Sequence, residues 1–340
     1  MQHLQPNTTL QGGKYRIERV LGQGGFDITY LAIQVSSNRQ VVIKEFFLFL
    51  DSVREDNSKR VLCNRQGLGL DCYLEAKEKS KQMAKHFLAI KNVHIVDVFD
   101  VFEENDTVYY VMGFFEGESL KELMNRIGHP MTEEEVSLII PQLLDALKSI
   151  HDDGICHLDI RPSNIMIDKT QQIKLIDFGF KVSFDQMLED KGVVIDTTCS
   201  TIPSYFPPEL LLRQYQRIGP WTDFYLLGAT IFILLTNQHP PFATDILDDN
   251  SEDKHFSLPL SAEVSHKMRS LILWLMNVKI KGRPQSVHEI QEFMAEPIFS
   301  SLQKTDCDQT KDVFESTKDQ KDNHKNRFWN ILLEKLFKGK

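Results

Sequence analysis

Cysteine is scarce in this sequence, and its five cysteines show no spacing typical of a metal site or a disulfide framework. This scarcity favours a reduced, cytoplasmic setting. Long hydrophobic runs are also lacking: the longest, residues 226–235, is too short to cross a bilayer and predicts a buried core helix. The first residues contain no apolar stretch of the kind that forms a secretory signal peptide.

Positive charge is in deficit as well. The 340 residues include 39 Lys and Arg against 48 Asp and Glu, which gives a net charge of −9 at pH 7. We therefore expect no nucleic-acid partner, because phosphate binding requires a basic surface. The length and the hydrophobic content of 41% are those of a globular protein of one or two domains with a sizeable core.

One part of the chain combines three oxygen-bearing side chains suited to phosphoryl transfer. Residues 157–164 read His-Leu-Asp-Ile-Arg-Pro-Ser-Asn, and Asp-Phe-Gly follows at 177–179. Asp159 can orient a hydroxyl nucleophile, and Asn164 and Asp177 can hold Mg²⁺, which prefers oxygen ligands. Because phosphoryl transfer requires mainly positioning and charge neutralisation, these residues predict that chemistry. The alternative interpretation is a polar loop between strands.

A glycine-rich segment connects two predicted strands near the N-terminus. Residues 15–21 and 28–33 have the apolar and polar patterning of strands, and Gly-Gln-Gly-Gly lies between them at 22–25. Because these glycines do not open a helix, the segment differs from a dinucleotide-binding fingerprint. Taken alone, it is equally an ordinary hairpin turn.

The second half of the chain has helical patterning. Thr132 and Glu135 have the spacing of a capping box, and the apolar residues that follow keep helical periodicity through Ile150. Residues 14–112 are rich in predicted strands, whereas residues 120–298 are rich in predicted helices. This change predicts a small β lobe and a larger α lobe, with a nucleotide-binding cleft between them.

These motifs, in the same order over residues 13–296, resemble those of bacterial Ser/Thr protein kinases, most of all kinases of the Bacteroidetes type. The resemblance rests on the loop 157–164, the triplet 177–179, the strand Val-Val-Ile-Lys at 41–44 and the segment Tyr-Phe-Pro-Pro-Glu at 205–209. It implies an α+β, two-lobed protein kinase fold. It also implies Mg-ATP-dependent phosphorylation of Ser or Thr in a protein.

The resemblance implies a role for each matching residue. Lys44 would contact the α and β phosphates, Asp159 would orient the acceptor hydroxyl, and Arg161 would offset charge on the γ phosphate. Asp223 would brace the catalytic loop, which we define as residues 157–164. Glu209 and Arg283 would form a buried pair. The metal ligands would be Asn164 and Asp177, and the other nucleotide-binding residues would be Leu21, Gly22, Gly24, Gly25, Thr29, Met112, Phe114 and Phe115.

Three positions depart from the family pattern near the phosphates and the substrate. Asp27 takes the place of the third glycine, where a carboxylate about 6 Å from a phosphate costs roughly 3 kcal/mol, and less than about 1 kcal/mol if it points to solvent. Arg161 replaces the usual Lys, and Ile202 replaces a Thr of the substrate-binding loop. Leu158 in place of an Arg looks usual for kinases of the Bacteroidetes type, and without that Arg phosphorylation of the following loop need not be the switch. Candidate autophosphorylation sites in that loop are Thr197, Thr198, Ser200 and Thr201.

A fourth departure concerns the partner of Lys44. The family's helix Glu falls on Met83, and the nearest acids, Glu75 and Glu78, require a shifted or bulged helix to reach the lysine. Loss of a charge-assisted hydrogen bond costs roughly 1.5–3 kcal/mol. An ATP-binding pseudokinase that acts as a scaffold or allosteric partner is therefore an alternative function, and a small-molecule phosphotransferase of kinase-like fold is a third.

The chain is expected to have four parts. An N-terminal extension (1–12) precedes a kinase domain (13–298) with lobes at 13–115 and 116–298. A polar linker (299–326) then leads to a basic amphipathic helix (327–340) with a net charge of +3. This helix is expected to contact an anionic membrane surface, the kinase domain or a partner helix, and these alternatives remain open.

Overall fold

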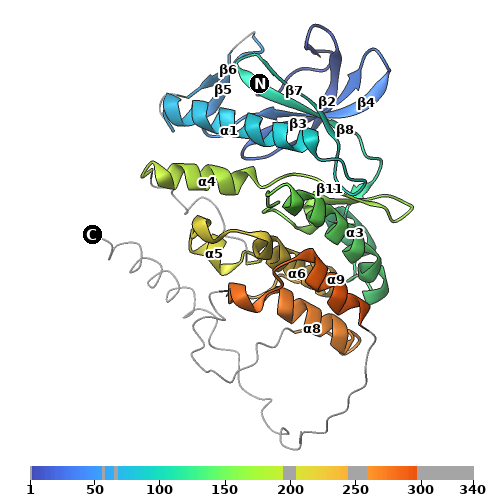
Figure 1. Cartoon of the computed structure of the whole chain (residues 1–340). Helices are drawn as coiled ribbons and strands as arrows, with labels where there is room; N and C mark the ends of the chain where they lie inside the picture. Colours follow the sequence, from blue (N-terminus) through green and yellow to red (C-terminus); the bar gives the residue numbers. More distant parts are fainter. Residues whose placement is uncertain (1, 56–57, 65–67, 194–203, 244–258, 297–340) are drawn as a thin grey trace, which may run out of the picture. The chain divides into compact units, whose positions relative to one another are not determined.

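A mixed set of strands and helices makes up the computed structural model, which describes residues 2–55, 58–64, 68–193, 204–243 and 259–296. The first part forms a six-stranded antiparallel sheet in the order β1-β2-β3-β4-β8-β7. Figure 1 shows this sheet, with helix α1, above a lobe of helices. The predicted α+β, two-lobed architecture is confirmed. The strands are Thr9–Leu10, Tyr15–Gln23, Asp27–Gln34, Arg39–Phe46, Thr107–Gly113 and Val98–Glu104 in that spatial order.

The strand register determines which side chains surround Lys44. Thr29 of β3 lies directly opposite Lys44 of β4, and Tyr110 of β8 lies opposite it on the other side. Because side chains alternate across a strand, Asp27 is on the same face of β3 as Thr29. A lysine side chain is long enough to reach such a diagonal neighbour.

A buried ion pair fastens the segment between β4 and α1 to the sheet. Glu45 accepts hydrogen bonds from the Tyr30 hydroxyl (2.7 Å), the Tyr109 hydroxyl (2.7 Å) and Arg54 Nη2 (2.6 Å). Burial, followed by the charge of Glu45, raises the pKa of both tyrosines. Arg54 lies in the hairpin β5 (Ser52–Arg54) and β6 (Val61–Cys63), and its Nε donates to the backbone oxygen of Gln2. The hairpin and the N-terminal segment are thereby held to one carboxylate.

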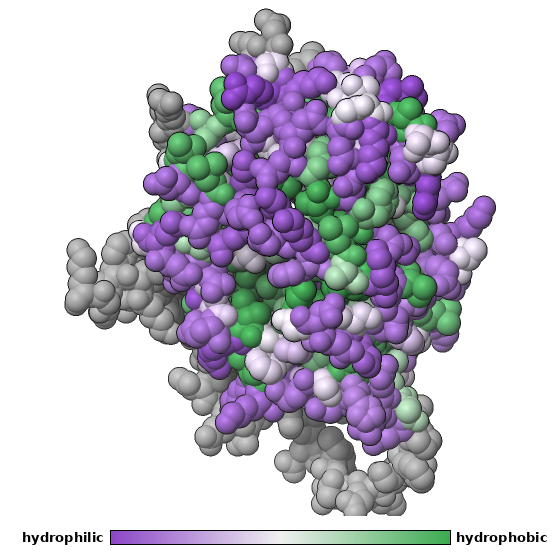
Figure 2. Space-filling model, turned by 45° about the horizontal axis from the view of Figure 1, so that its top comes forward, coloured by the Kyte–Doolittle hydropathy of each residue, from purple (hydrophilic) through white to green (hydrophobic). Residues whose placement is uncertain are grey.

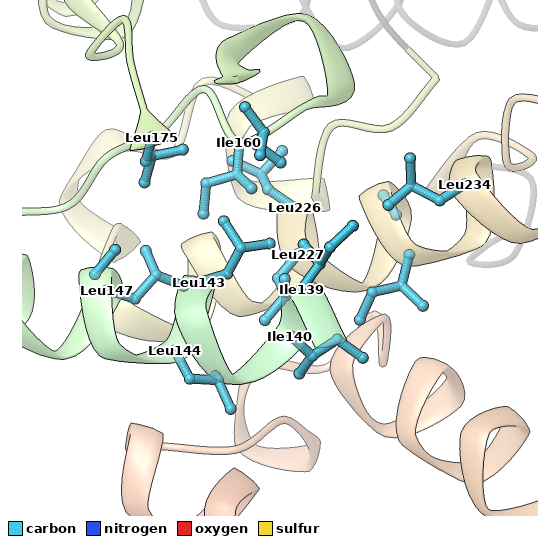
Figure 3. Close-up of a cluster of buried hydrophobic side chains, with 14 of the residues drawn as sticks. Ile139, Ile140, Leu143, Leu144, Leu147, Ile160, Leu175, Leu226, Leu227 and Leu234 are labelled. Atoms are coloured by element: carbon cyan, nitrogen blue, oxygen red, sulfur yellow. The ribbon is translucent and has the colours of Figure 1, made fainter. Parts of the chain in front are cut away.

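The helical lobe is built around α3 (Glu133–Asp152) and α6 (Pro220–Thr236), whose apolar side chains form one core. Figure 3 shows leucine and isoleucine side chains of both helices in contact, with Ile160 and Leu175 beside them. The predicted capping box of Thr132 and Glu135 is confirmed, as is the buried helix over residues 226–235. The other helices of this lobe are α2 (Leu120–Ile127), α5 (Pro208–Leu211), α8 (His266–Leu275) and α9 (Val287–Ala295).

A second small sheet holds the segments that flank the catalytic loop. Strands β10 (Ile165–Ile167) and β11 (Ile173–Leu175) pair antiparallel, and β9 (Glu118–Ser119) pairs with β10. The sequence His-Ile-Val at 94–96 predicts a strand that begins at His94, and this prediction is wrong. Residues 94–96 make a single bridge to Leu175, and β7 begins at Val98.

The surface is mainly hydrophilic. In Figure 2 polar residues cover most of the face in view, and hydrophobic atoms gather in patches near its centre. Within the described ranges, each helix is too short or too polar to traverse a bilayer.

Candidate active site

The catalytic loop is anchored by the buried carboxylate of Asp223 in α6. Its two oxygens accept hydrogen bonds from the backbone N–H groups of His157 (2.8 Å) and Leu158 (2.7 Å). Oδ2 also lies 2.8 Å from Nε2 of His151, the residue near the end of α3. These bonds hold Leu158 at a φ of 63°, a left-handed conformation that a leucine rarely adopts without such support. The predicted bracing role of Asp223 is confirmed.

Asp159 is oriented by three neighbours. Asn164 donates from Nδ2 to Asp159 Oδ2 at 2.7 Å and to its backbone oxygen at 2.9 Å. Arg161 Nε lies 3.2 Å from Asp159 Oδ1. Burial lowers the pKa of His157, so its ring is neutral at pH 7 and Nδ1 can accept the Asp159 N–H. The structure therefore brings together three of the predicted residues, with the carboxylate of Asp159 partly exposed.

Lys44 links the sheet to the second predicted metal ligand. Its ammonium group contacts Asp177 Oδ1 and lies 3.2 Å from Asp27 Oδ2, while its side chain is only 6% exposed. Asp177 has a φ of 62°, and its side chain is 38% exposed. Burial first, and then the charge of Asp27, raises the pKa of Tyr110 beside this group. A lysine and two carboxylates thus share one partly buried space.

Helix α1 (Leu70–Ala89) brings no carboxylate to Lys44. Met83 and Ser80 border Asp177 in a cavity of about 20 Å³. Glu75 instead forms an ion pair with Lys191 at 2.9 Å, and Glu78 lies 3.4 Å from Lys81. The possibility that Glu75 or Glu78 pairs with Lys44 through a shifted helix is thus not realised in this structure.

The segment after the Asp-Phe-Gly triplet forms a helix that the sequence interpretation did not include. This helix, α4 (Phe180–Asp190), lies directly below α1 in Figure 1. The rings of Phe180 and Phe184 meet the ring of Phe26, in the glycine-rich turn, at centroid distances of 5.5 and 5.2 Å. The apolar residues Phe180, Phe184, Met187 and Leu188 have helical spacing, and that signal could have predicted the helix.

Gly179 is required by a close approach of two backbones. Its N–H donates to His157 O at 2.8 Å. A Cβ added at Gly179 would lie 2.8 Å from that same oxygen and 2.8 Å from Leu158 Cβ. The glycine therefore lets the triplet lie against the catalytic loop.

We expect Gly179→Ala to destabilise the protein by about 1–3 kcal/mol, the usual cost of an overpacked contact with backbone atoms. The midpoint of urea unfolding would measure this change. Gly192→Ala is the matched control for packing, because a Cβ at Gly192 would meet no atom within 4 Å, although its φ of 68° adds local strain. A larger loss at Gly192 than at Gly179 would contradict the steric explanation.

The other predicted nucleotide-binding residues lie along the same side of the sheet or at its end. Gly22 is near the end of β2, Gly24 and Gly25 form the turn, and Gly24 N donates to Asp27 O at 2.9 Å. Met112 is buried in β8, whereas Leu21 and Phe114 are about 40% exposed. Phe114 and Phe115 also border a cavity of about 750 Å³ that extends over α2 and α3 and includes neither Lys44 nor Asp177.

Glu209 and Arg283 form the predicted buried pair. Arg283 Nη1 and Nη2 donate to the two carboxylate oxygens at 2.7 and 3.1 Å, and neither side chain is more than 1% exposed. Thr222 adds a hydrogen bond to Glu209, and the guanidinium lies 4.8 Å from the centre of the Tyr225 ring. The predicted substrate-loop residue Ile202 and the four candidate autophosphorylation sites at 197–201 lie outside the described residues, as does the tail from 299 to 340.

Comparison with known proteins connects this geometry to a family. The model of the protein kinase domain matches residues 15–299. The serine/threonine-protein kinase pkn2 of Myxococcus xanthus is 28% identical over 305 residues, which cover 86% of this chain and 33% of the relative. The serine/threonine-protein kinase PrkC of Bacillus subtilis is 31% identical over 233 residues, covering 67% and 31%.

The structural comparison agrees with the sequence comparison. The solved structure described as the apo form of PpkA-294 superposes with a TM-score of 0.73 at 26% identity, covering 86% of this chain and all of that one. The chain spans about one third of the length of the two curated bacterial relatives.

Proposed function

Since the chain belongs to the protein kinase family, with bacterial Ser/Thr kinases among its relatives, we propose that it transfers the γ phosphate of Mg-ATP to a Ser or Thr hydroxyl of a protein. The observation that carries this proposal is the arrangement of four side chains. Lys44 contacts Asp177, and Asn164 contacts Asp159. These contacts support the proposal because they join the residues that would hold phosphates, metal and acceptor hydroxyl in two pairs.

Each side chain then has a specific task. Lys44 holds the α and β phosphates as a buried, compact positive charge. Asp159, held by Asn164 and Arg161, accepts a hydrogen bond from the acceptor hydroxyl and orients it toward the phosphorus atom. Arg161 also offsets charge on the γ phosphate. This division of work requires positioning and charge neutralisation rather than a covalent intermediate.

The donor set supports a magnesium ion. Asn164 donates its amide N–H to Asp159, which leaves its carbonyl oxygen Oδ1 as the atom that would bind a metal, and Asp177 offers a partly exposed carboxylate. Hard oxygen ligands of this kind suit Mg²⁺. When bound, Mg²⁺ would neutralise negative charge on the phosphates.

The decisive experiment measures incorporation of labelled phosphate from ATP into the protein and into a generic basic substrate. We expect incorporation that requires Mg²⁺, stops on chelation and returns when Mg²⁺ is restored. Asp177→Asn should reduce the rate by about 100-fold or more, because a charged metal ligand is lost. Asp190→Asn, the same change at an exposed position of α4, should leave the rate unchanged. Full activity of Asp177→Asn would contradict the assignment.

A specific observation favours a second candidate, an ATP-binding pseudokinase that acts as a scaffold. Helix α1 lacks an acid at Lys44, and α4 packs against Phe26 of the glycine-rich turn. No incorporation by the wild type, together with a melting temperature that Mg-ATP raises, would support this candidate. Phosphorylation of small alcohols but of no protein would instead support a small-molecule phosphotransferase.

A further inference from the structure

Lys44 is a buried cation with two carboxylate partners. Asp27 stands where the family pattern has a glycine, and Asp177 is also a predicted metal ligand. Its side chain is 6% exposed, so an unpaired ammonium group would pay a large desolvation cost. The two partners that the described part of the chain provides are Asp177 and Asp27. If Asp177 binds Mg²⁺, as proposed above, its charge is shared with the metal. Asp27 is then the partner that remains dedicated to the lysine.

The surroundings of Asp27 fix its carboxylate in this position. Asp27 is the first residue of β3, and its backbone oxygen accepts the Gly24 N–H at 2.9 Å, which closes the glycine-rich turn. One carboxylate oxygen lies 3.4 Å from the Thr29 hydroxyl, and the other lies 3.2 Å from Lys44 Nζ. The side chain is only 24% exposed, so it points along the sheet toward the lysine rather than into solvent.

The acids of α1 have other partners. Glu75 pairs with Lys191 after α4, and Glu78 lies beside Lys81 and Gln82 of its own helix. The side chain that borders Asp177 from α1 is the apolar Met83. Asp27, on the neighbouring strand β3, therefore provides Lys44 with a carboxylate that α1 does not provide.

We propose that Asp27 is a positioning residue that holds Lys44 in place to receive the phosphates of ATP, a task for which α1 provides no acidic side chain. This inference rests on the proposed nucleotide binding at Lys44. The opposite physical effect is repulsion between Asp27 and the same phosphates. The two effects predict changes of opposite sign when the charge is removed, so one substitution decides between them.

The experiment measures the dissociation constants of Mg-ATP and of adenosine for the full chain and for Asp27→Asn. If Asp27 positions Lys44, the variant should bind Mg-ATP about 10- to 150-fold more weakly, the range that corresponds to loss of one charge-assisted hydrogen bond. Adenosine has no phosphate to contact Lys44, so its affinity should be unchanged. A general structural defect would weaken both ligands. Tighter or unchanged binding of Mg-ATP by the variant would overturn the inference.

Two further variants make the result specific. Asp27→Glu keeps the charge one methylene further out and should retain most of the Mg-ATP affinity; a loss as large as that of Asp27→Asn would overturn a role for the charge. Glu75→Gln removes an acid of α1 that contacts Lys191 and should not change the affinity. A larger loss from Glu75→Gln than from Asp27→Asn would also overturn the inference, because the helix would then supply the partner.

The binding readout separates this inference from the proposed function. Affinity for Mg-ATP that depends on Asp27, without phosphate transfer, would refute the kinase activity and support the role of Asp27. Phosphate transfer that is indifferent to Asp27→Asn would do the reverse.

Discussion

Asp159→Asn should lower the turnover number by about 10²–10⁴-fold, the range associated with loss of a positioned acid–base group. The asparagine has nearly the same shape and can still accept the hydrogen bond from Asn164 Nδ2, which lies 2.7 Å from the carboxylate in the wild type. It has no negative charge to pair with Arg161 and cannot take the proton of an acceptor hydroxyl. Steady-state rates of labelled-phosphate transfer, with ATP and a protein substrate varied separately, would measure this effect.

The affinity for ATP should stay within about twofold of the wild type in this variant, because Asp159 contacts residues of its own loop and neither Lys44 nor Asp27. The matched control is Asp153→Asn, an exposed aspartate at the end of α3 in the same stretch of chain. A turnover number that falls equally in both variants would indicate a general defect in the helical lobe. An unchanged turnover number in Asp159→Asn alone would remove Asp159 from the reaction.

The departures from the family pattern fall on both sides of the predicted site: Asp27 and Met83 lie near Lys44, and Arg161 lies in the catalytic loop. On the side of the helical lobe, Asp159 and Asn164 are hydrogen-bonded, and Asp223 holds the loop that carries them. On the side of the sheet, α1 offers Lys44 no carboxylate, and the lysine contacts Asp27 and Asp177. The residues predicted to position the acceptor hydroxyl therefore contact one another, whereas Lys44, predicted to contact the phosphates, has a set of carboxylate partners that differs from the family pattern. We expect the rate to be limited by nucleotide binding more than by the positioning of the acceptor.

The catalytic loop could be predicted from the sequence because its residues are close together in the chain. Asp159, Arg161 and Asn164 lie within six positions, so their chemical types and spacing were sufficient. Asp223 and the pair of Glu209 with Arg283 were identified through resemblance, and the structure confirms their contacts. Spacing alone could not have joined these residues: Asp223 reaches the loop only when α6 packs beside it, and Glu209 of α5 meets Arg283 only in the folded helical lobe.

Two features escaped prediction for physical reasons. The contact of Asp27 with Lys44 depends on strand register and on the rotamer of each side chain, and only the register can be derived from two adjacent strands. The ion pair of Glu45 with Arg54 joins a central strand to a separate hairpin, so no local pattern indicates it. In both cases the role of the carboxylate depends on a cation that lies beside it only in the folded structure.

Arg283→Met should destabilise the protein by about 3–5 kcal/mol, because it leaves the carboxylate of Glu209 buried without its charged partner. Both side chains are at most 1% exposed, and the guanidinium group donates to both oxygens of Glu209. Arg283 Nε also donates to the backbone oxygen of Asn277 at 2.5 Å, and this bond would be lost as well. The shift of the urea midpoint at constant slope would measure the change.

The double variant Glu209→Gln/Arg283→Met shows whether the uncompensated charge causes this loss. It removes both charges, and the amide can still accept the hydrogen bond from the Thr222 hydroxyl, which lies 2.9 Å from Glu209 Oε1. We expect the double variant to be more stable than Arg283→Met alone, since replacing both members of a buried ion pair is often close to neutral, whereas removing one is not. Arg217→Met, at an exposed arginine whose side chain donates a hydrogen bond to the neighbouring Gln214, should cost less than about 0.5 kcal/mol. If the double variant is the less stable of the two, the attraction between the charges outweighs their desolvation. The ion pair would then make a net favourable contribution to the free energy of unfolding.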